Sequence, residues 1–236
     1  MNKQDGAIVV STVNMSAGYG PQPVINDINI EVHAGEVVAL LGPNGAGKTT
    51  TLLALSGELT PLKGEIRLDG TATRSPLYKR ARNGLTFVTE EKSVFKGMST
   101  RDNLRVGGVD IADALALFPE LEKKLDTRGG LLSGGEQQML TLARALARKP
   151  RLLLADELSM GLAPLIVKRL LEAVRMAADQ QGTAVLLVEQ HVRKALRYAD
   201  RAYVMRRGRI ELTGSAEDMR SRIDEIEESY LSSSGA

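Results

Sequence analysis

A run of five apolar residues leads directly into a glycine-rich turn, and this succession constrains the fold more than any other feature of the sequence. The run is Val37–Leu41, and residues 42–49 after it read Gly-Pro-Asn-Gly-Ala-Gly-Lys-Thr. Such a run is typical of a strand buried on both faces, as in a parallel sheet covered by helices. Residues 49–55 are patterned as a helix. We therefore expect a buried strand, a tight loop and a helix in immediate succession.

The glycines of this loop allow backbone N–H groups to point inward and form a concave anion site at the N-terminus of a helix. Lys48 is placed to reach the β and γ phosphates of a nucleotide, and the Thr49 hydroxyl is placed to ligate Mg²⁺. An ordinary glycine turn is the alternative, which the strand before it and the helix after it disfavour. The residues expected to contact ATP are Gly42, Pro43, Asn44, Gly45, Ala46, Gly47, Lys48, Thr49 and Thr50.

Another apolar run, at residues 152–155, ends in two adjacent carboxylates. A phosphate loop needs a carboxylate at the end of a neighbouring strand to hold the metal ion through water. We therefore predict that Asp156 is the Mg²⁺ partner, and that Glu157 orients or deprotonates the water that attacks the γ-phosphate. The alternative is an Asp-Glu pair that only begins a loop after a strand.

Strand and helix patterns alternate along the rest of the chain, which predicts an α/β fold. Strands are expected at 28–32, 152–155 and 184–188, and helices at 137–146 and 165–177. The stretches 65–68 and 209–212 lie beside glycine turns and predict antiparallel strands or hairpins. Residues 100–132 lack buried strand runs and show helical patterning, which favours a helical insertion.

The composition sets limits on partners and location. The chain has 31 basic and 29 acidic side chains, so its net charge of +2 gives no reason to expect a nucleic acid partner. The absence of cysteine excludes disulfides and thiolate chemistry and is compatible with the cytoplasm. Residues 1–7 are polar and no run of about 18 apolar residues occurs, so we expect neither a signal segment nor a membrane span. The small polar tail 232–236 is expected to fray.

A second glycine-rich segment reads Leu132-Ser133-Gly134-Gly135-Glu136. Ser133 and Glu136 have the spacing of a capping box at the start of a helix. Capping leaves the two glycines unexplained, because each glycine in a first helical turn weakens the helix by about 1 kcal/mol. Their exposed N–H groups suit a second phosphate contact.

With this segment and the glutamine-rich helix start that follows it, the sequence resembles the ATP-binding cassette (ABC) family, from about residue 10 to 214. The resemblance implies the ABC ATPase fold, a P-loop NTPase (RecA-like) mixed sheet core with an antiparallel β subdomain and a helical insertion. It also implies a head-to-tail dimer with a second copy or a paralogue. In that dimer, residues 133–136 of one subunit cover the γ-phosphate held at Lys48 of the other.

Other positions gain roles from the resemblance alone. Tyr19 resembles the aromatic residue that stacks on adenine, and His191 resembles the switch histidine that contacts the γ-phosphate. Glu90 stands where the family commonly has Gln, which touches Mg²⁺ and the attacking water. Residues 159–164 resemble the loop that couples the two sites. The catalytic residues expected are Glu157, His191, Lys48 and Glu90, the metal ligands are Thr49, Glu90 and Asp156, and the departures from the family pattern are Glu90, Thr89, Leu158 and Ala155.

Glu90 and the segments 161–164 and 189–201 resemble the ATPases of branched-chain amino-acid importers. That resemblance implies two transmembrane permease subunits, an external solute-binding protein that acts indirectly, and a place on the cytoplasmic face of the membrane. We expect a single nucleotide-binding domain. Its core lies at 1–86 and 150–214, its helical subdomain at 87–149, and its C-terminal helix and tail at 215–236. A soluble clamp in protein assembly or regulation is the alternative, whereas Glu157 and His191 disfavour a module that no longer hydrolyses ATP.

Overall fold

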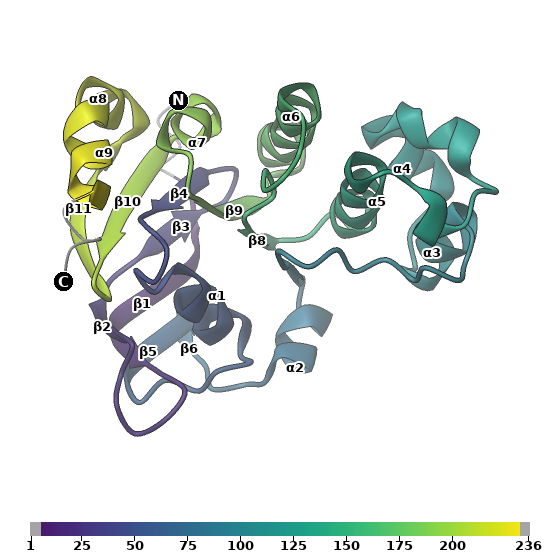
Figure 1. Cartoon of the computed structure of the whole chain (residues 1–236). Helices are drawn as coiled ribbons and strands as arrows, with labels where there is room; N and C mark the ends of the chain where they lie inside the picture. Colours follow the sequence, from purple (N-terminus) through teal and green to yellow (C-terminus); the bar gives the residue numbers. More distant parts are fainter. Residues whose placement is uncertain (1–5, 232–236) are drawn as a thin grey trace.

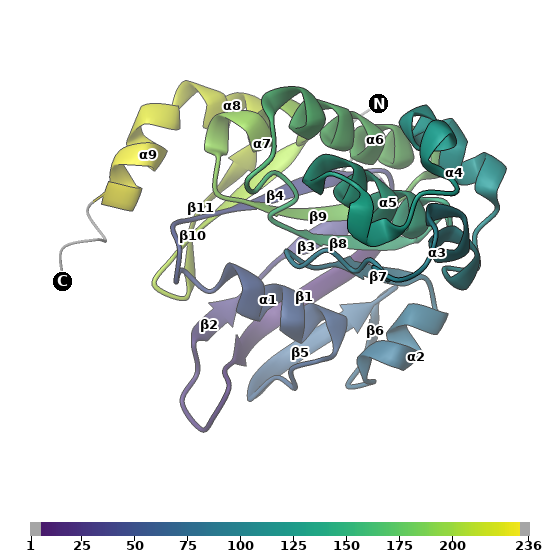
Figure 2. The same cartoon turned by 45° about the vertical axis from the view of Figure 1, so that its right-hand side comes forward.

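The computed structural model describes residues 6–231, which form two sheets with helices around them (Figures 1 and 2). The strands of the larger sheet are β4 (Val37–Leu41), β7 (Leu85–Val88), β8 (Leu152–Asp156), β9 (Ala184–Glu189), β10 (Arg201–Arg206) and β11 (Arg209–Ser215). Their order is β11-β10-β4-β9-β8-β7, and all pairs are parallel except β10 with β11. The three central strands β4, β9 and β8 are buried along their whole length, as their continuous apolar runs predict.

The smaller sheet is antiparallel and is built around one long strand. Its strands are β1 (Ile8–Ala17), β2 (Ile25–Ile28), β3 (Glu31–His33), β5 (Lys63–Leu68) and β6 (Thr71–Ala72). β1 pairs with β2, β3 and β5, and β6 continues the sheet beyond β5. The antiparallel strands predicted at 65–68 and 209–212 are confirmed as parts of β5 and β11.

The prediction of one continuous strand at 28–32 is wrong. The chain leaves the strand geometry at Asn29 and Ile30, so β2 and β3 pair with different parts of β1. Thr12 of β1 bridges the break, because its hydroxyl donates to Ile28 O at 2.8 Å and accepts from Ile30 N at 2.9 Å. The alternation of buried and exposed side chains persists through the break, which explains why the sequence pattern does not reveal it.

Helices cover both faces of the larger sheet. The helix α1 (Lys48–Ser56) and the antiparallel sheet pack on one face, against Leu40, Leu154 and Val188. The other face carries α5 (Gly134–Leu146) and α6 (Pro164–Gln181), which pack on Leu153 and Leu187. Beside them lie α7 (Val192–Tyr198), α8 (Ala216–Ser221) and α9 (Ile223–Leu231). The residues that alternate along a strand therefore point to two different cores.

The predicted helical insertion is confirmed, and it lies to one side of the sheets (Figure 1). It contains α3 (Thr100–Val106), α4 (Ile111–Leu117) and the 3-10 helices η2 (Pro119–Lys124) and η3 (Gly129–Leu131), and it packs on α5, while α2 (Leu77–Arg82) precedes it. Ser99 and Asp110 cap α3 and α4 by accepting from the N–H groups of Asp102 and Ala112. No helix within residues 6–231 is long and apolar enough to cross a membrane. The tail expected at 232–236 lies outside the described residues, as do residues 1–5.

Candidate active site

The loop between β4 and α1 has the conformation that its glycines predict. Gly47 precedes α1 with a φ of 105°, in the left-handed region that favours glycine. At Gly42 a side chain would overlap the carbonyl oxygen of Met205 in the neighbouring strand β10. Gly47 thus turns the chain into the helix, and Gly42 permits close contact between the backbones of the loop and β10. The N-terminus of α1 therefore faces the cavity with its N–H groups unpaired by any side-chain cap.

Lys48, the first residue of α1, is 5% exposed and turns back over the loop. Its Nζ donates to Gly42 O at 2.9 Å and to Pro43 O at 3.2 Å. Glu157 Oε1 lies 3.6 Å from the same nitrogen. Burial lowers the pKa of Lys48, and the charges of Glu157 and Asp156 act in the opposite direction. The ammonium group is thus held at the mouth of the phosphate loop, where the sequence places it.

Thr49 and Asp156 meet although 107 residues separate them in sequence. Thr49 Oγ1 donates to Asp156 Oδ2 at 2.9 Å, which joins the first turn of α1 to the end of β8. Asp156 is 4% exposed, and burial raises its pKa. Its other oxygen, Oδ1, is buried without a hydrogen-bond partner among the described residues. Such an unsatisfied acceptor fits a site that holds a cation through water.

A cavity of about 380 Å³ lies in front of these residues. Its lining consists of the loop residues Asn44, Gly45 and Gly47, the α1 residues Lys48, Thr49 and Thr50, and Val24, Glu90, Glu157 and Met160. Glu157 has a φ of 45°, which is unusual for a residue other than glycine and occurs preferentially at functional sites. Its N–H donates to Val188 O at 3.0 Å, so β9 supports this backbone.

Tyr19 lies on the loop after β1 and reaches the first turn of α1. Its hydroxyl is 3.4 Å from Thr50 Oγ1, and the side chain is 68% exposed. The ring therefore stands beside the cavity with its surface free for a planar partner.

The segment 133–136 lies at the start of α5 and contributes none of the residues that line this cavity. The predicted capping box is present, because Ser133 Oγ accepts from Glu136 N at 3.3 Å and Glu136 Oε2 accepts from Ser133 N at 2.8 Å. The bond from the Ser133 N–H lowers the pKa of Glu136. Gly134 and Ser133 are exposed, so the helix start is open to a ligand or another chain.

Sequence reasoning did not find the contact between Ser159 and Glu189. Ser159 Oγ donates to Glu189 Oε2 at 2.7 Å, and Ser159 N donates to Oε1 at 3.2 Å. Glu189 is 1% exposed, and burial raises its pKa to about 7. The contact fastens the loop after β8 to the end of β9. The sequence signal that could have indicated Glu189 is a carboxylate at the end of an apolar strand, the same signal that indicates Asp156.

His191 is exposed and does not line the cavity. Side chains alternate between the two faces of β9, the strand that ends just before His191. Val188 packs on the α1 face of the sheet, whereas Leu187 packs on the opposite face and Glu189 reaches Ser159. Gln190 is the first residue after β9, and an extension of the alternation predicts that it, rather than His191, lies on the face of the phosphate loop, although Gln190 does not line the cavity either. The role expected for His191 stays a prediction, and Gln190 is a candidate that the sequence motif did not suggest.

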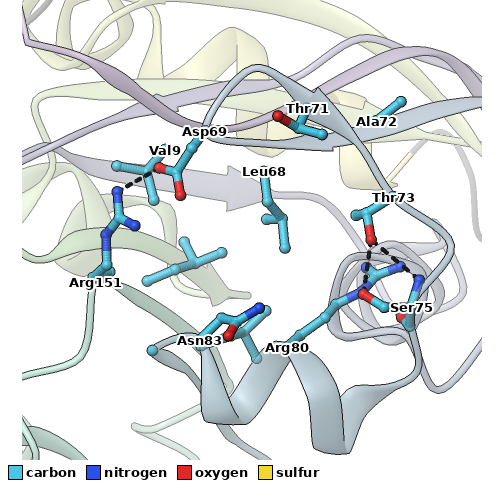
Figure 3. A pocket seen from close by; sticks show the side chains of 13 residues that line it. Val9, Leu68, Asp69, Thr71, Ala72, Thr73, Ser75, Arg80, Asn83 and Arg151 are labelled. Carbon is cyan, nitrogen blue, oxygen red and sulfur yellow. Dashed lines mark hydrogen bonds and ion pairs between the residues drawn. The ribbon is translucent and has the colours of Figure 1, made fainter.

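A further cavity, of about 220 Å³, lies between the antiparallel sheet, α2 and the start of β8 (Figure 3). Four of its polar side chains pair with one another: Asp69 with Arg151 at 2.6 Å, and Thr73 with Ser75 at 2.7 Å. Arg80, only 1% exposed, donates to carbonyl oxygens at the C-terminal end of α1 (Ala54 O at 3.1 Å and Leu55 O at 2.6 Å). A cation there suits the negative end of the helix dipole. Arg80 thus anchors the helix whose other end forms the phosphate loop.

The family model described as "ABC transporter" matches residues 25–159. The high-affinity branched-chain amino acid transport ATP-binding protein BraG of Pseudomonas aeruginosa is 40% identical over 220 residues, covering 88% of this chain and 94% of that protein. The lipopolysaccharide export system ATP-binding protein LptB of Acidithiobacillus ferridurans is 38% identical, covering 85% of this chain and 88% of that protein.

Solved structures agree with this relationship. The structure of an ATP-binding subunit of an ABC transporter superimposes with a TM-score of 0.80 at 27% identity, over 94% of this chain and 99% of that one. A nucleotide-free ATP-binding cassette from an ABC transporter has a TM-score of 0.81 at 22% identity, over 92% and 95% of the two chains, and supports the fold alone. The chain therefore belongs to the ABC transporter family as an ATP-binding subunit, and it hydrolyses ATP.

Proposed function

We propose that this chain is the ATPase subunit of an importer for branched-chain amino acids or a similar small polar solute. The observation that carries the proposal is its 40% identity with BraG over almost the full length of both chains. The convergence of Lys48, Thr49 and Glu157 on one cavity supports the ATPase part.

The charges of the cavity support a requirement for Mg²⁺. Lys48 is a single ammonium group, and the carboxylates of Asp156, Glu157 and Glu90 lie close enough for their charges to act on it or on one another. Nucleotide phosphates add further negative charge, so a divalent cation is needed to offset the repulsion. Thr49 Oγ1, Asp156 and Glu90 are the residues that would hold it, with water and phosphate oxygens completing the shell. When bound, the ion supplies charge stabilisation to the γ-phosphoryl oxygens.

Hydrolysis in this proposal is an in-line attack of water on the γ-phosphate. Glu157 accepts a hydrogen bond from the water and aligns it, and Lys48 and the loop N–H groups hold the phosphates. Tyr19 stacks on the adenine. No covalent intermediate on the protein is required, because the transition state places its charge on phosphoryl oxygens.

The site is completed by a second ABC ATPase subunit. Ser133, Gly134, Gly135 and Glu136 of one chain reach the γ-phosphate bound at the phosphate loop of the other, in a homodimer or with a paralogue. The exposure of Ser133 and Gly134, and their absence from the cavity lining of their own chain, support this arrangement. Exposed N–H groups at the start of α5 are suitable donors to a phosphate.

The permease subunits dock on a groove of about 360 Å³ between β7, α2 and α5. Phe87 and Thr141 line it together with two guanidinium groups, Arg144 and Arg148. Arg144 Nε is buried and has no acceptor among the described residues, which supports a partner that brings carbonyl or carboxylate oxygens. The chain then lies on the cytoplasmic face of the membrane, and an external solute-binding protein acts on it only through the permease.

Reconstitution of the chain with the membrane subunits that co-purify with it tests the proposal. Stimulation of ATP hydrolysis by leucine, isoleucine or valine, with the cognate external binding protein present, is the expected result. The 38% identity with LptB makes lipopolysaccharide export the second candidate. Stimulation by lipopolysaccharide instead of amino acids would select it. Recovery of the chain only in soluble complexes would contradict both candidates and favour a clamp.

A further inference from the structure

A groove between α6 and α7 combines an apolar floor with a cationic rim. It encloses about 420 Å³. One wall is a single stripe of α6, because its residues recur at helical spacing. The α6/α7 groove is lined by Pro164, Val167, Lys168 and Leu171 from α6 and by Arg193, Lys194, Arg197 and Tyr198 from α7. The two helices lie side by side in Figures 1 and 2.

Among the residues that the structure describes, no carboxylate lines this groove. Lys168 and Arg193 pair with acidic residues outside it, at 3.7 Å and 2.8 Å respectively. Within residues 6–231 no carboxylate lies within salt-bridge distance of Lys194 or Arg197, and both side chains are exposed. Val167 and Leu171 are buried at the floor, at 3% and 1% exposure. The groove therefore has an apolar base and, at its edge, two cations without a carboxylate in salt-bridge distance, of which Lys194 acts on the buried carboxyl of Glu189 through its charge.

The chain itself shows how α7 binds an acidic helix. The Arg193 NH2 nitrogen donates to Asp224 at 2.8 Å and to Glu227 at 3.3 Å, two carboxylates one turn apart on α9. Lys194 and Arg197 present the same chemistry on the groove side of α7. We propose that the α6/α7 groove docks an acidic amphipathic segment of a partner protein, with apolar side chains on Val167 and Leu171 and carboxylates on Lys194, Arg197 and Lys168.

A peptide segment fits this groove better than a lipid surface does. The cations surround a hollow with an apolar floor instead of extending over a flat face, and a flat bilayer cannot reach the floor. Both helices of the groove also connect to the loops of the active site. α6 begins at Pro164, just after the loop that contains Ser159, and α7 begins at Val192, shortly after Glu189. A segment held between the two helices would therefore act on both sides of the Ser159–Glu189 contact. The proposed docking does not depend on which solute is transported.

The test uses the full chain and a fluorescent helical peptide of Glu and Leu, with Leu on one face. A matched peptide has Gln in place of Glu. Fluorescence anisotropy should show binding of the Glu peptide, with the Gln peptide bound at least about tenfold more weakly. The double variant Lys194→Glu/Arg197→Glu should weaken binding of the Glu peptide by about tenfold or more, whereas Lys79→Glu on the exposed face of α2 should not change it.

Circular dichroism of each variant establishes that the fold is retained. Raising the salt from 0.05 M to 0.5 M should also weaken binding, because the proposed contacts are exposed ion pairs. Equal binding of the two peptides, or equal binding by the wild type and the double variant, would overturn the proposal. So would failure of the Glu peptide to bind. Co-sedimentation with phosphatidylglycerol vesicles that requires Lys194 and Arg197, without peptide binding, would assign the groove to a membrane surface instead.

Discussion

The hydroxyl of Thr49 donates to Asp156 Oδ2 at 2.9 Å, and this bond ties the first turn of α1 to the end of β8. Both groups belong to the proposed Mg²⁺ site, so Mg²⁺ binding should depend on the hydroxyl of residue 49 more than on the size of its side chain. Thr49→Val removes the hydroxyl and keeps the shape, whereas Thr49→Ser keeps the hydroxyl. We expect Thr49→Val to raise the Mg²⁺ concentration for half-maximal ATP hydrolysis by roughly tenfold or more, and Thr49→Ser to stay near the wild type. Equal Mg²⁺ requirements for the two variants would remove Thr49 from the metal site.

Glu157 is 3.6 Å from Lys48 and faces the cavity at a strained backbone position. Replacing it with Gln keeps its shape and removes the carboxylate that aligns the water. We expect Glu157→Gln to lower the rate of ATP hydrolysis by at least about 100-fold while ATP still binds. Steady-state phosphate release and a nucleotide titration measure the two effects separately. A variant that hydrolyses ATP at the parent rate would exclude the proposed role of Glu157.

Gln190 and His191 follow β9 in succession, and an extension of the strand alternation predicts only Gln190 on the α1 face of the sheet. Because the alternation favours Gln190, we expect Gln190→Ala to slow ATP hydrolysis by about tenfold or more and His191→Ala to have a smaller effect. The two variants are matched controls for each other, since both shorten an exposed side chain directly after β9. The reverse order of effects would restore His191 as the residue that contacts the γ-phosphate.

Glu189 makes the stability of the fold depend on pH. Burial raises its pKa from 4.5 to about 7, so between these values the folded chain binds more protons than the unfolded chain. The free energy of unfolding therefore falls as the pH rises through this window. The Glu189→Gln variant lacks this contribution. Between pH 4.5 and 8 the free energy of unfolding of the wild type should therefore fall by on the order of 1 to 3 kcal/mol more than that of the variant. Urea unfolding of both proteins measures the difference. Parallel pH profiles would show that Glu189 ionises normally.

Local sequence patterns predict the part of the candidate active site that is formed by β4, the phosphate loop and α1. The strand Val37–Leu41 has the predicted bounds, and the start of α1 differs by one residue. Asp156 was also predicted, because parallel strands end at one edge of a sheet and an apolar run marks the strand. These inferences need only periodicity and the chemistry of glycine and carboxylate.

Other features depend on contacts between distant segments, so local patterns could not reveal them. Arg80 binds the end of α1 from 25 residues away, and its sequence neighbours give no sign of its burial. The break at Asn29 and Ile30 arises because β1 changes partners beside a hydroxyl from Thr12. The contact of Ser159 with Glu189 likewise joins the loop after β8 to the end of β9, across 30 residues of sequence.

In the proposed active site, ATP joins two chains, with the phosphate loop of one facing Ser133 of the other. The Glu157→Gln variant, which should bind ATP without consuming it, allows this to be measured by sedimentation equilibrium. We predict a monomer without nucleotide, a dimer with ATP and Mg²⁺, and loss of the dimer but not of ATP binding when Ser133→Arg is added. A Glu157→Gln chain that binds ATP and stays monomeric, or a dimer that Ser133→Arg leaves intact, would contradict the account.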